Sequence, residues 1–222
     1  MAEFHVVDRE NRARYAAVMD AHFKLRKRLY IDGRKWRALS APDGREIDQF
    51  DLPSTTYLFG LTGTGDVVSG SRLHPSTGPT LMADVFPQLA EVRGLERGPD
   101  VWEWTRVFVD PARRRSERGP DPEAGAIYCA VLQHALDHGI RSLNIVTEMF
   151  YLERYVALGW SIRVLGEPLE HEGMSLVGIN VRIEQAAIAA TRRFYGIGPT
   201  VFARRDAWQD ARVDWIAPAP GP

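Results

Sequence analysis

The sequence contains a single cysteine, Cys129, among its 222 residues, so no disulfide can form within the chain. Its six histidines show no metal-ligand spacing, and the sequence therefore predicts no metal site. Basic residues are not in excess, because 28 Lys and Arg residues are balanced by 29 Asp and Glu residues. Proteins that bind nucleic acid usually show such an excess, so we expect no nucleic-acid partner.

Long apolar runs are absent as well. No run approaches the roughly 20 residues that a membrane-spanning helix needs, so no membrane association is expected. Residues 1–7 lack the basic start and apolar core of a signal peptide, which together with the other absences predicts a cytoplasmic protein. With 45% hydrophobic residues the chain can bury one substantial core. We expect a single domain over residues 1–222, with a peripheral tail after about residue 205.

The hydrophobic pattern divides the chain into helices and strands. Helical spacing predicts helices over about residues 9–30, 127–139, 150–158 and 184–195. Alternation and turn signals predict strands over about residues 3–7, 57–62, 67–73, 102–109, 142–147, 161–165 and 174–183. This order predicts the α/β class, as a three-layer αβα sandwich with a mixed, mostly antiparallel central sheet.

The strand at residues 102–109 carries two charges in an otherwise aromatic and β-branched segment. Glu103 and Arg106 lie three residues apart, so the alternation of a regular strand places them on opposite faces. An unpaired buried charge is costly, and we expect at least one of the two to line a cleft with partners from elsewhere. The acidic segment at residues 46–51 and the arginines Arg26 and Arg72 are the nearest source of such partners.

Residues 34–49 form a long predicted loop that includes this acidic segment. Loops of this length without regular structure tend to be functional or disordered. Trp36 and Phe50 argue against disorder, since aromatic residues are depleted in disordered segments. We therefore expect an ordered lid over a site. Arg26 lies beside the apolar stripe of the preceding helix, where a solvated arginine at the helix edge is an equally good interpretation.

A basic loop follows the charged strand and precedes a helix, and its arginines are Arg113, Arg114, Arg115 and Arg118. A helix N-terminus beside such a loop can bind anions through its backbone N–H groups and its dipole. The combination suits a phosphopantetheine thioester, and the arrangement resembles the acyl-CoA N-acyltransferase (GNAT) fold. A solvated basic face is the alternative interpretation.

Several motifs then match one family pattern at the right spacing. The pattern begins with Arg, an aromatic residue and Trp, and continues through Gly-x-Glu-x-Asp-x-aromatic-Asp, Gly-x-Arg-Leu-x-Pro-x-Thr-x-Pro, Phe and Trp-Glu-x-Ser/Thr-Arg. The matching residues are Arg26, Tyr30, Trp36, Gly44, Glu46, Asp48, Phe50, Asp51, Gly70, Arg72, Leu73, Pro75, Thr77, Pro79, Phe86, Trp102, Glu103, Thr105 and Arg106. Over about residues 4–182 the sequence resembles the acyl-homoserine-lactone synthases, the LuxI-type autoinducer synthase family.

Two positions depart from the common family pattern. Tyr30 stands where Phe is commoner, which retains stacking but adds a hydroxyl that needs a partner. The segment Glu-Met-Phe-Tyr-Leu at residues 148–152 is bulkier than in many members. It is similar to Glu-Thr-Trp-Trp-Leu in a branch that takes branched or aryl acyl groups from coenzyme A thioesters, so the resemblance implies the acyl-CoA-using branch.

The resemblance implies a reaction in which S-adenosylmethionine is acylated and then closes to a lactone, releasing methylthioadenosine. The catalytic residues that it implies are Glu103, Arg72, Asp48 and Arg106. Glu103 would be the base for the methionyl ammonium, and Arg72 would hold Asp48 and Glu103 in position. The S-adenosylmethionine site would consist of Arg26, Tyr30, Trp36, Asp48, Asp51, Phe86, Trp104, Thr105 and Arg106. Strand carbonyls near Trp104 and Thr105 would help to hold the amine.

The acyl pocket implied by the resemblance contains Leu73, Met82, Met149, Phe150, Tyr151 and Leu152. The arginines of the basic loop would bind the phosphates of coenzyme A or an acidic acyl carrier protein. Both substrates are small molecules, an acyl carrier protein is a possible partner, and no cofactor is expected.

Plainer interpretations stay open beside these. Arg72 and Asp51 could belong to a buried ion-pair network that only fixes the loop, and Phe150, Tyr151 and Met82 could be ordinary core residues. A general N-acetyltransferase would use acetyl-CoA without S-adenosylmethionine and would leave the acidic loop unexplained. A small-molecule sensor on the same fold would bind its ligand without turnover.

Overall fold

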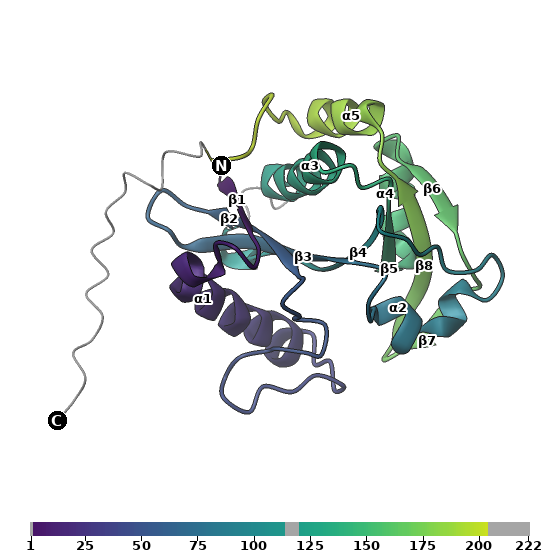
Figure 1. Ribbon diagram of the computed structural model, residues 1–222, viewed down its shortest axis with the longest axis horizontal. Helices are drawn as coiled ribbons and strands as arrows, with labels where there is room; N and C mark the ends of the chain where they lie inside the picture. The colour runs from purple at the N-terminus through teal and green to yellow at the C-terminus, as the bar shows by residue number, and fades with distance from the viewer. Residues whose placement is uncertain (1, 114–119, 204–222) are drawn as a thin grey trace.

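The structure is a computed structural model that describes residues 2–113 and 120–203. Eight strands form one sheet: β1 Glu3–Val7, β2 Thr56–Leu61, β3 Val67–Pro75, β4 Val101–Val109, β5 Ser142–Glu148, β6 Ser161–Val164, β7 Leu169–His171 and β8 Met174–Arg182. The α-helices are α1 Ala16–Arg26, α2 Leu81–Asp84, α3 Pro122–Asp137, α4 Leu152–Ala157 and α5 Gln185–Tyr195. Helix α1 lies on one side of the sheet and α3 and α5 lie on the other (Figure 1). The predicted αβα sandwich is confirmed.

The sheet is mixed and mostly antiparallel, with strand order β1-β2-β3-β4-β5-β8-β6 and β7 paired to β8. The only parallel pair among the described strands is β4 with β5. The charged strand β4 is therefore central, between β3 and β5, as its aromatic and β-branched composition predicts.

The pairing of β4 with β5 is short. It extends only from Val101 opposite Ser142 to Glu103 opposite Asn144. Beyond that point β4 stays paired with β3, whereas β5 stays paired with β8. The two central strands consequently part just after Glu103, and their facing backbone groups form no ladder with each other there.

The two faces of the sheet bury different cores. On one face Trp104 of β4 packs edge-on against Tyr128 of α3 at 5.9 Å between ring centroids, and lies 6.1 Å from Trp160. On the other face Phe23 of α1 packs edge-on against Tyr57 of β2. The acidic loop and α1 thus share one face of the sheet, and the main aliphatic core with α3 occupies the other.

The predicted helix over residues 9–30 differs in detail from the structure. A 3-10 turn at Arg12–Tyr15 leads into α1, and a π-helical turn at Lys27–Gly33 ends it. π-turns widen a helix locally and often occur at functional sites. Here the turn contains Tyr30 and lies between Arg26, the last residue of α1, and the loop that follows.

Strand β7 was not predicted, because its three residues are too few to show an alternating pattern; it pairs as a short hairpin with β8. Among the described residues no helix is long and apolar enough to cross a membrane.

Candidate active site

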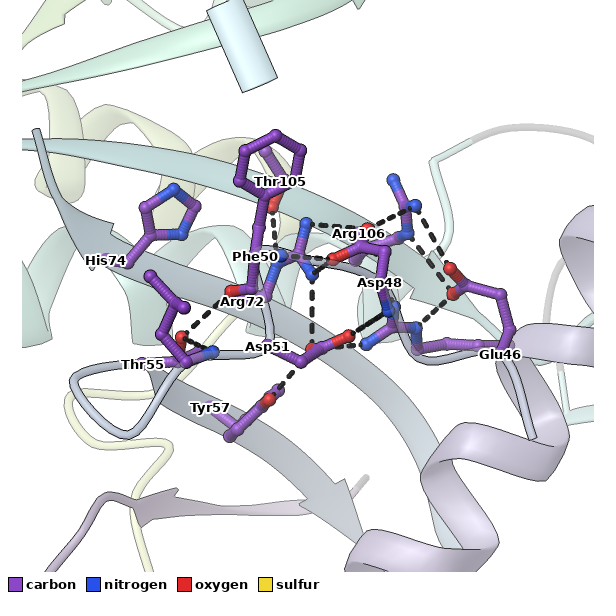
Figure 2. A network of polar contacts seen from close by, with 12 residues as sticks. Glu46, Asp48, Phe50, Asp51, Thr55, Tyr57, Arg72, His74, Thr105 and Arg106 are labelled. Atoms are coloured by element: carbon purple, nitrogen blue, oxygen red, sulfur yellow. Dashed lines mark hydrogen bonds and ion pairs between the residues drawn. The ribbon is translucent and has the colours of Figure 1, made fainter. Parts of the chain in front are cut away.

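Three arginines and three carboxylates form a buried cluster beneath the acidic loop (Figure 2). The arginines come from three elements, with Arg26 at the end of α1, Arg72 in β3 and Arg106 in β4. The carboxylates all come from the loop before β2, and they are Glu46, Asp48 and Asp51. The equal numbers of opposite charges allow the cluster to be buried without an unpaired ion.

Arg26 is completely buried, and each of its three guanidinium nitrogens donates a hydrogen bond. Its Nε donates to Glu46, while Nη1 and Nη2 donate to the two oxygens of Asp51 at 2.8 and 3.0 Å. Such a two-pronged pair fixes orientation as well as charge. The loop is thereby attached to the end of α1, and the open question about Arg26 is answered in favour of a buried, paired arginine.

Asp48 joins the other two arginines. It receives Arg72 Nη1 and Nη2 at 2.5 and 3.2 Å, and Arg106 Nη2 at 2.6 Å. Burial would raise the pKa of Asp48, but the charges of Arg72 and Arg106 outweigh burial and hold that pKa below its usual value. Burial would also raise the pKa of Asp51, but the charges of Arg26 and Arg72 outweigh the effect of burial and hold that pKa well below its usual range. Both carboxylates therefore stay ionised.

The prediction that Glu103 and Arg106 lie on opposite faces of the strand is wrong. Arg106 has a left-handed backbone conformation with φ of 53°, and the register shifts there because Gly70 faces Phe108 whereas Arg72 faces Thr105. Two residues of β4 thus oppose one of β3, which is a β-bulge. The extra residue resets the alternation, and Arg106 reaches Asp48, the carboxylate that Arg72 also binds, together with Glu46.

Two aromatic rings cover one side of the cluster. Tyr30 stacks on Trp36 with ring centroids 4.8 Å apart and planes only 6° from parallel, and the guanidinium of Arg106 lies 5.5 Å from the Tyr30 ring. Burial raises the pKa of Tyr30 to about 12, so the hydroxyl keeps its proton and donates to the carbonyl of Val107 at 3.2 Å. The partner that this hydroxyl requires is therefore a backbone group of β4.

The same loop reaches across to the far half of the sheet. Arg34 lies 5.6 Å from the Trp36 ring and donates to Glu148 at the end of β5 at 2.6 Å. The backbone N–H of Arg37 donates to Glu172, between β7 and β8, at 3.1 Å. These contacts agree with an ordered loop that spans the point where β4 and β5 part.

Glu103 is completely buried next to the cluster but has its own partners. Its Oε2 accepts the backbone N–H of Leu81 at 2.7 Å and its Oε1 accepts that of Met82 at 2.8 Å. Nε2 of His74 lies 3.1 Å from Oε2. Arg72 donates instead to Thr105 and Asp48, and the described residues show no contact between Arg72 and Glu103. The expectation that Arg72 directly holds Glu103 is therefore not met.

Three residues of this site were missed as candidates from the sequence. Glu46 was recognised as part of the acidic segment and of the family motif but was given no role in the site, although it bridges Arg26 and Arg106. His74 lies two residues after Arg72 and so on the same face of β3, which is the one signal that pointed to it. Tyr57 donates to Asp51 at 2.8 Å and had no signal beyond its place in a strand.

Other predicted residues of the S-adenosylmethionine site lie elsewhere. The Trp104 side chain lies in the core on the α3 face, away from the cluster, so only its backbone is available to the site. Phe86 packs edge-on against His171 at 5.0 Å, and neither is in the arginine cluster. Thr105, by contrast, accepts a hydrogen bond from Arg72 Nε at 2.9 Å. Roles in binding for these three residues stay predictions.

The six predicted acyl-pocket residues do not gather in one place. Leu73 is in the core on the α3 face and Met82 is in a small cluster with Leu165. Tyr151 and Leu152 pack half-buried against the main core. Met149 and Phe150 are 42% and 64% exposed, and the whole set of acyl contacts stays a prediction.

The predicted phosphate-binding loop is largely beyond the described residues, since Arg114, Arg115 and Arg118 lie outside them. Arg113 is exposed and lies 3.4 Å from Asp66. Helix α3 begins with Asp121 as its N-cap, and Glu123 in its first turn accepts the backbone N–H of Ala2. Two acidic residues at this helix end reduce its attraction for phosphate.

Comparison with known proteins identifies relatives along most of the chain. Residues 10–190 match the autoinducer synthase family. The isovaleryl-homoserine lactone synthase of Bradyrhizobium diazoefficiens is 36% identical over 184 residues, which is 83% of this chain and 81% of that protein.

Solved structures agree with this match. The coenzyme A-dependent acyl-homoserine lactone synthase BjaI, solved with S-adenosylmethionine (SAM) and isopentyl-CoA, gives a TM-score of 0.84 at 34% identity over 93% of this chain and 97% of that one. The coenzyme A-dependent synthase MesI gives 0.82 at 38% identity over 90% and 98%. An acyl-CoA N-acyltransferase from Pseudomonas aeruginosa shares the fold alone, with a TM-score of 0.57 at 13% identity over 81% and 99%. The chain belongs to the autoinducer synthase family and is an acyltransferase of the acyl-homoserine-lactone synthase type.

Proposed function

We propose that this enzyme acylates S-adenosylmethionine with a branched or aryl acyl group from a coenzyme A thioester, and then closes the product to an N-acyl-L-homoserine lactone with release of methylthioadenosine. The observation that carries the proposal is the position of Glu103. This buried carboxylate lies where β4 and β5 part, beside a cluster of arginines and carboxylates that is already paired. A relative with the same fold, BjaI, has been solved with S-adenosylmethionine and isopentyl-CoA.

The first step transfers the acyl group. Glu103 takes a proton from the methionyl ammonium, and the freed amine attacks the thioester carbonyl. The carbon–sulfur bond of the thioester breaks and the coenzyme A sulfur leaves as a thiol, taking the second proton from nitrogen. In the second step a carboxylate oxygen of the substrate attacks the carbon next to the sulfonium, that carbon–sulfur bond breaks, and methylthioadenosine departs uncharged.

The contacts within the cluster suggest different roles for Arg26 and Arg106. Arg26 is completely buried and each of its guanidinium nitrogens donates to Glu46 or Asp51, so it positions the loop. Arg106 uses Nε and Nη2 for Glu46 and Asp48, and Nη1 has no contact recorded among the described residues. Arg106 is therefore the better cation for the substrate carboxylate. A preorganised cluster of this kind needs little rearrangement when charge develops in the reaction.

The aromatic pair has the right chemistry for the remaining part of the substrate. A cationic sulfonium is attracted to the face of an aromatic ring, and a purine stacks on one. Trp36 and Tyr30 stack together, and the Tyr30 ring lies beside Arg106, so a substrate whose carboxylate binds Arg106 would have these rings within reach. Asp48 and Asp51 add negative charge near the sulfonium.

The proposed binding of the acyl donor is supported by the sequence pattern and by the relatives. The bulky segment at residues 148–152 would limit the length of the acyl group, and Leu73 belongs to the same core against which Tyr151 and Leu152 pack, whereas Met82 lies in a separate cluster. Arg113, with the arginines after it, would bind phosphate groups of coenzyme A, and an acyl carrier protein is the alternative donor. We further propose that the whole chain is one synthase domain, works in the cytoplasm and uses no cofactor.

The proposal is tested by incubating the purified enzyme with S-adenosylmethionine and a panel of acyl donors. The panel contains acetyl-, hexanoyl-, isovaleryl- and cinnamoyl-CoA, and the same acyl groups on acyl carrier protein. Release of methylthioadenosine with the branched or aryl CoA thioesters, and a lactone of matching mass, is the expected result. Acetyl transfer to another amine, or ligand binding without turnover, would identify a general acetyltransferase or a sensor instead.

A further inference from the structure

His74 is a buried titratable residue to which the reaction above gives no role. It is 1% exposed, and neither ring nitrogen makes a hydrogen bond within the described part of the chain. A buried polar atom without a partner is costly, and such an atom in a native protein needs an explanation. The orphaned nitrogens therefore point to a partner that the ring acquires during function.

The nearest charged group to the ring is Glu103. Nε2 of His74 lies 3.1 Å from Oε2 of Glu103, which is within reach of a hydrogen bond, although the ring is not aligned to donate one. Catalytic hydrogen bonds are often poorly aligned before substrate binds and tighten in the complex. The ring lies parallel to Phe50, with centroids 6.1 Å apart, and the guanidinium of Arg72 lies 5.8 Å from Phe50.

The two oxygens of Glu103 are not equivalent. A carboxylate offers about four acceptor positions. Oε2 accepts from Leu81 and has His74 beside it, whereas Oε1 accepts only from Met82. If His74 donates to Oε2, that oxygen is fully occupied and a lone pair of Oε1 is left for a proton from the substrate.

We propose that His74 is a positioning residue that donates its Nε2–H to Oε2 of Glu103, so that Oε1 becomes the oxygen that accepts the ammonium proton. The inference rests on the proposed role of Glu103 as the base. It adds a residue of β3 to those that support catalysis, and it gives the two oxygens of the Glu103 carboxylate different functions.

Three substitutions at His74 separate this role from simple packing. His74→Gln places an amide donor near the position of Nε2, His74→Asn places one near Nδ1, and His74→Phe retains a ring against Phe50 without any donor. A hydrogen bond to a charged group is worth roughly tenfold to 100-fold, so the Phe and Asn variants should lose at least about tenfold in kcat. The Gln variant should stay within about threefold, with KM for S-adenosylmethionine unchanged in all three.

A spectroscopic measurement examines the contact without turnover. The ring nitrogens of ¹⁵N-histidine-labelled protein are observed, and the His74 signals are assigned as those missing from His74→Phe. These signals should move in Glu103→Gln and stay in place in Glu10→Gln, a matched change at an exposed residue.

The outcomes are distinct. Unmoved His74 signals in Glu103→Gln overturn the inference, whether or not the enzyme turns over. Equal kcat in the Gln, Asn and Phe variants, with changes only in thermal midpoint, overturns it as well and assigns His74 to packing. Full turnover by Glu103→Gln also removes the role, because no base is left to position. The proposed function fails separately, when wild type releases no methylthioadenosine with any acyl donor.

Discussion

Replacing Asp51 with Asn is the sharpest test of whether the buried cluster holds the site together. Asp51 accepts four hydrogen bonds, from Arg26 Nη1 and Nη2, from the Tyr57 hydroxyl and from the backbone N–H of Asp48, at 2.8 to 3.0 Å. It also lies 3.1 Å from Arg72. An amide keeps one acceptor oxygen but turns an N–H group towards donors, and it removes the negative charge that compensates Arg26.

The expected loss in stability follows from the burial of that arginine. Removing one partner of a buried ion pair costs about 3–5 kcal/mol because the remaining charge stays buried without compensation. Domains of this kind are stable by only about 5–15 kcal/mol, so the loss is large. Urea unfolding followed by tryptophan fluorescence should show a clearly lower midpoint for Asp51→Asn at neutral pH. Asp43→Asn is the matched control, since Asp43 is an exposed carboxylate of the same loop paired with Arg45, and its midpoint should not change.

The pH dependence gives a second measure of the same carboxylate. Arg26 and Arg72 hold the pKa of Asp51 below its usual value in the folded protein, against the effect of burial. The unfolded chain therefore takes up a proton near pH 4 that the folded protein does not bind. Wild-type stability should fall as the pH drops below about 4, by up to about 1.4 kcal/mol per pH unit for each such carboxylate.

Asp51→Asn lacks this titration, so the stability difference between wild type and variant should narrow in acid. A variant with a wild-type midpoint at neutral pH, or a difference that stays constant down to pH 3, would refute the reasoning. The first result would mean that Asp51 adds nothing to stability, and the second that its contribution does not come from its ionised carboxylate.

Three predictions concern catalysis. Glu103→Gln should keep S-adenosylmethionine binding, measured by calorimetry, while kcat falls by about 10²–10⁴, the typical contribution of a general base; unchanged turnover would remove Glu103 from that role. Trp36→Ala should weaken S-adenosylmethionine binding by roughly tenfold through lost stacking, whereas Trp36→Phe should retain most of the affinity; equal affinities in both would place the ring outside the site. Tyr151→Ala should shift preference towards larger acyl-CoA thioesters in a competition assay, with the exposed Val156 changed to Ala as the control, and an unchanged acyl profile would assign Tyr151 to the core.

The sequence predicted the sheet well because most strands are long enough for their patterns to show. Strand β4 was predicted from its aromatic and β-branched residues, and the structure places it at the centre of the sheet. The cost of burying charge predicted that the acidic segment, Arg26 and Arg72 supply partners for a charge of this strand, although a solvated Arg26 was an equally good interpretation. That argument needs no coordinates, because an ion that must be buried has to be paired.

What the sequence did not predict depends on backbone conformation. Nothing in the local pattern marks Arg106 as left-handed, since such residues are usually Gly or Asn. The partners of Glu103 are backbone N–H groups of Leu81 and Met82, which have no side-chain signature. His74 was overlooked because a histidine in a strand is usually an ordinary buried residue, and only its distance from Glu103 singles it out.

The left-handed residue at the centre of β4 divides this strand into two halves with opposite phase. In the first half Glu103 and Thr105 lie on the same face of the sheet as the arginine cluster, and the bulge places Arg106 on that face as well. Deleting Val107 would restore a regular pleat in which Phe108 still lies opposite Gly70, while Arg106 would turn to the other face, away from Asp48. The position of the charged groups in this site therefore depends on the number of residues in the strand as well as on their identity. A single-residue deletion here should disable the enzyme even if every charged group were kept.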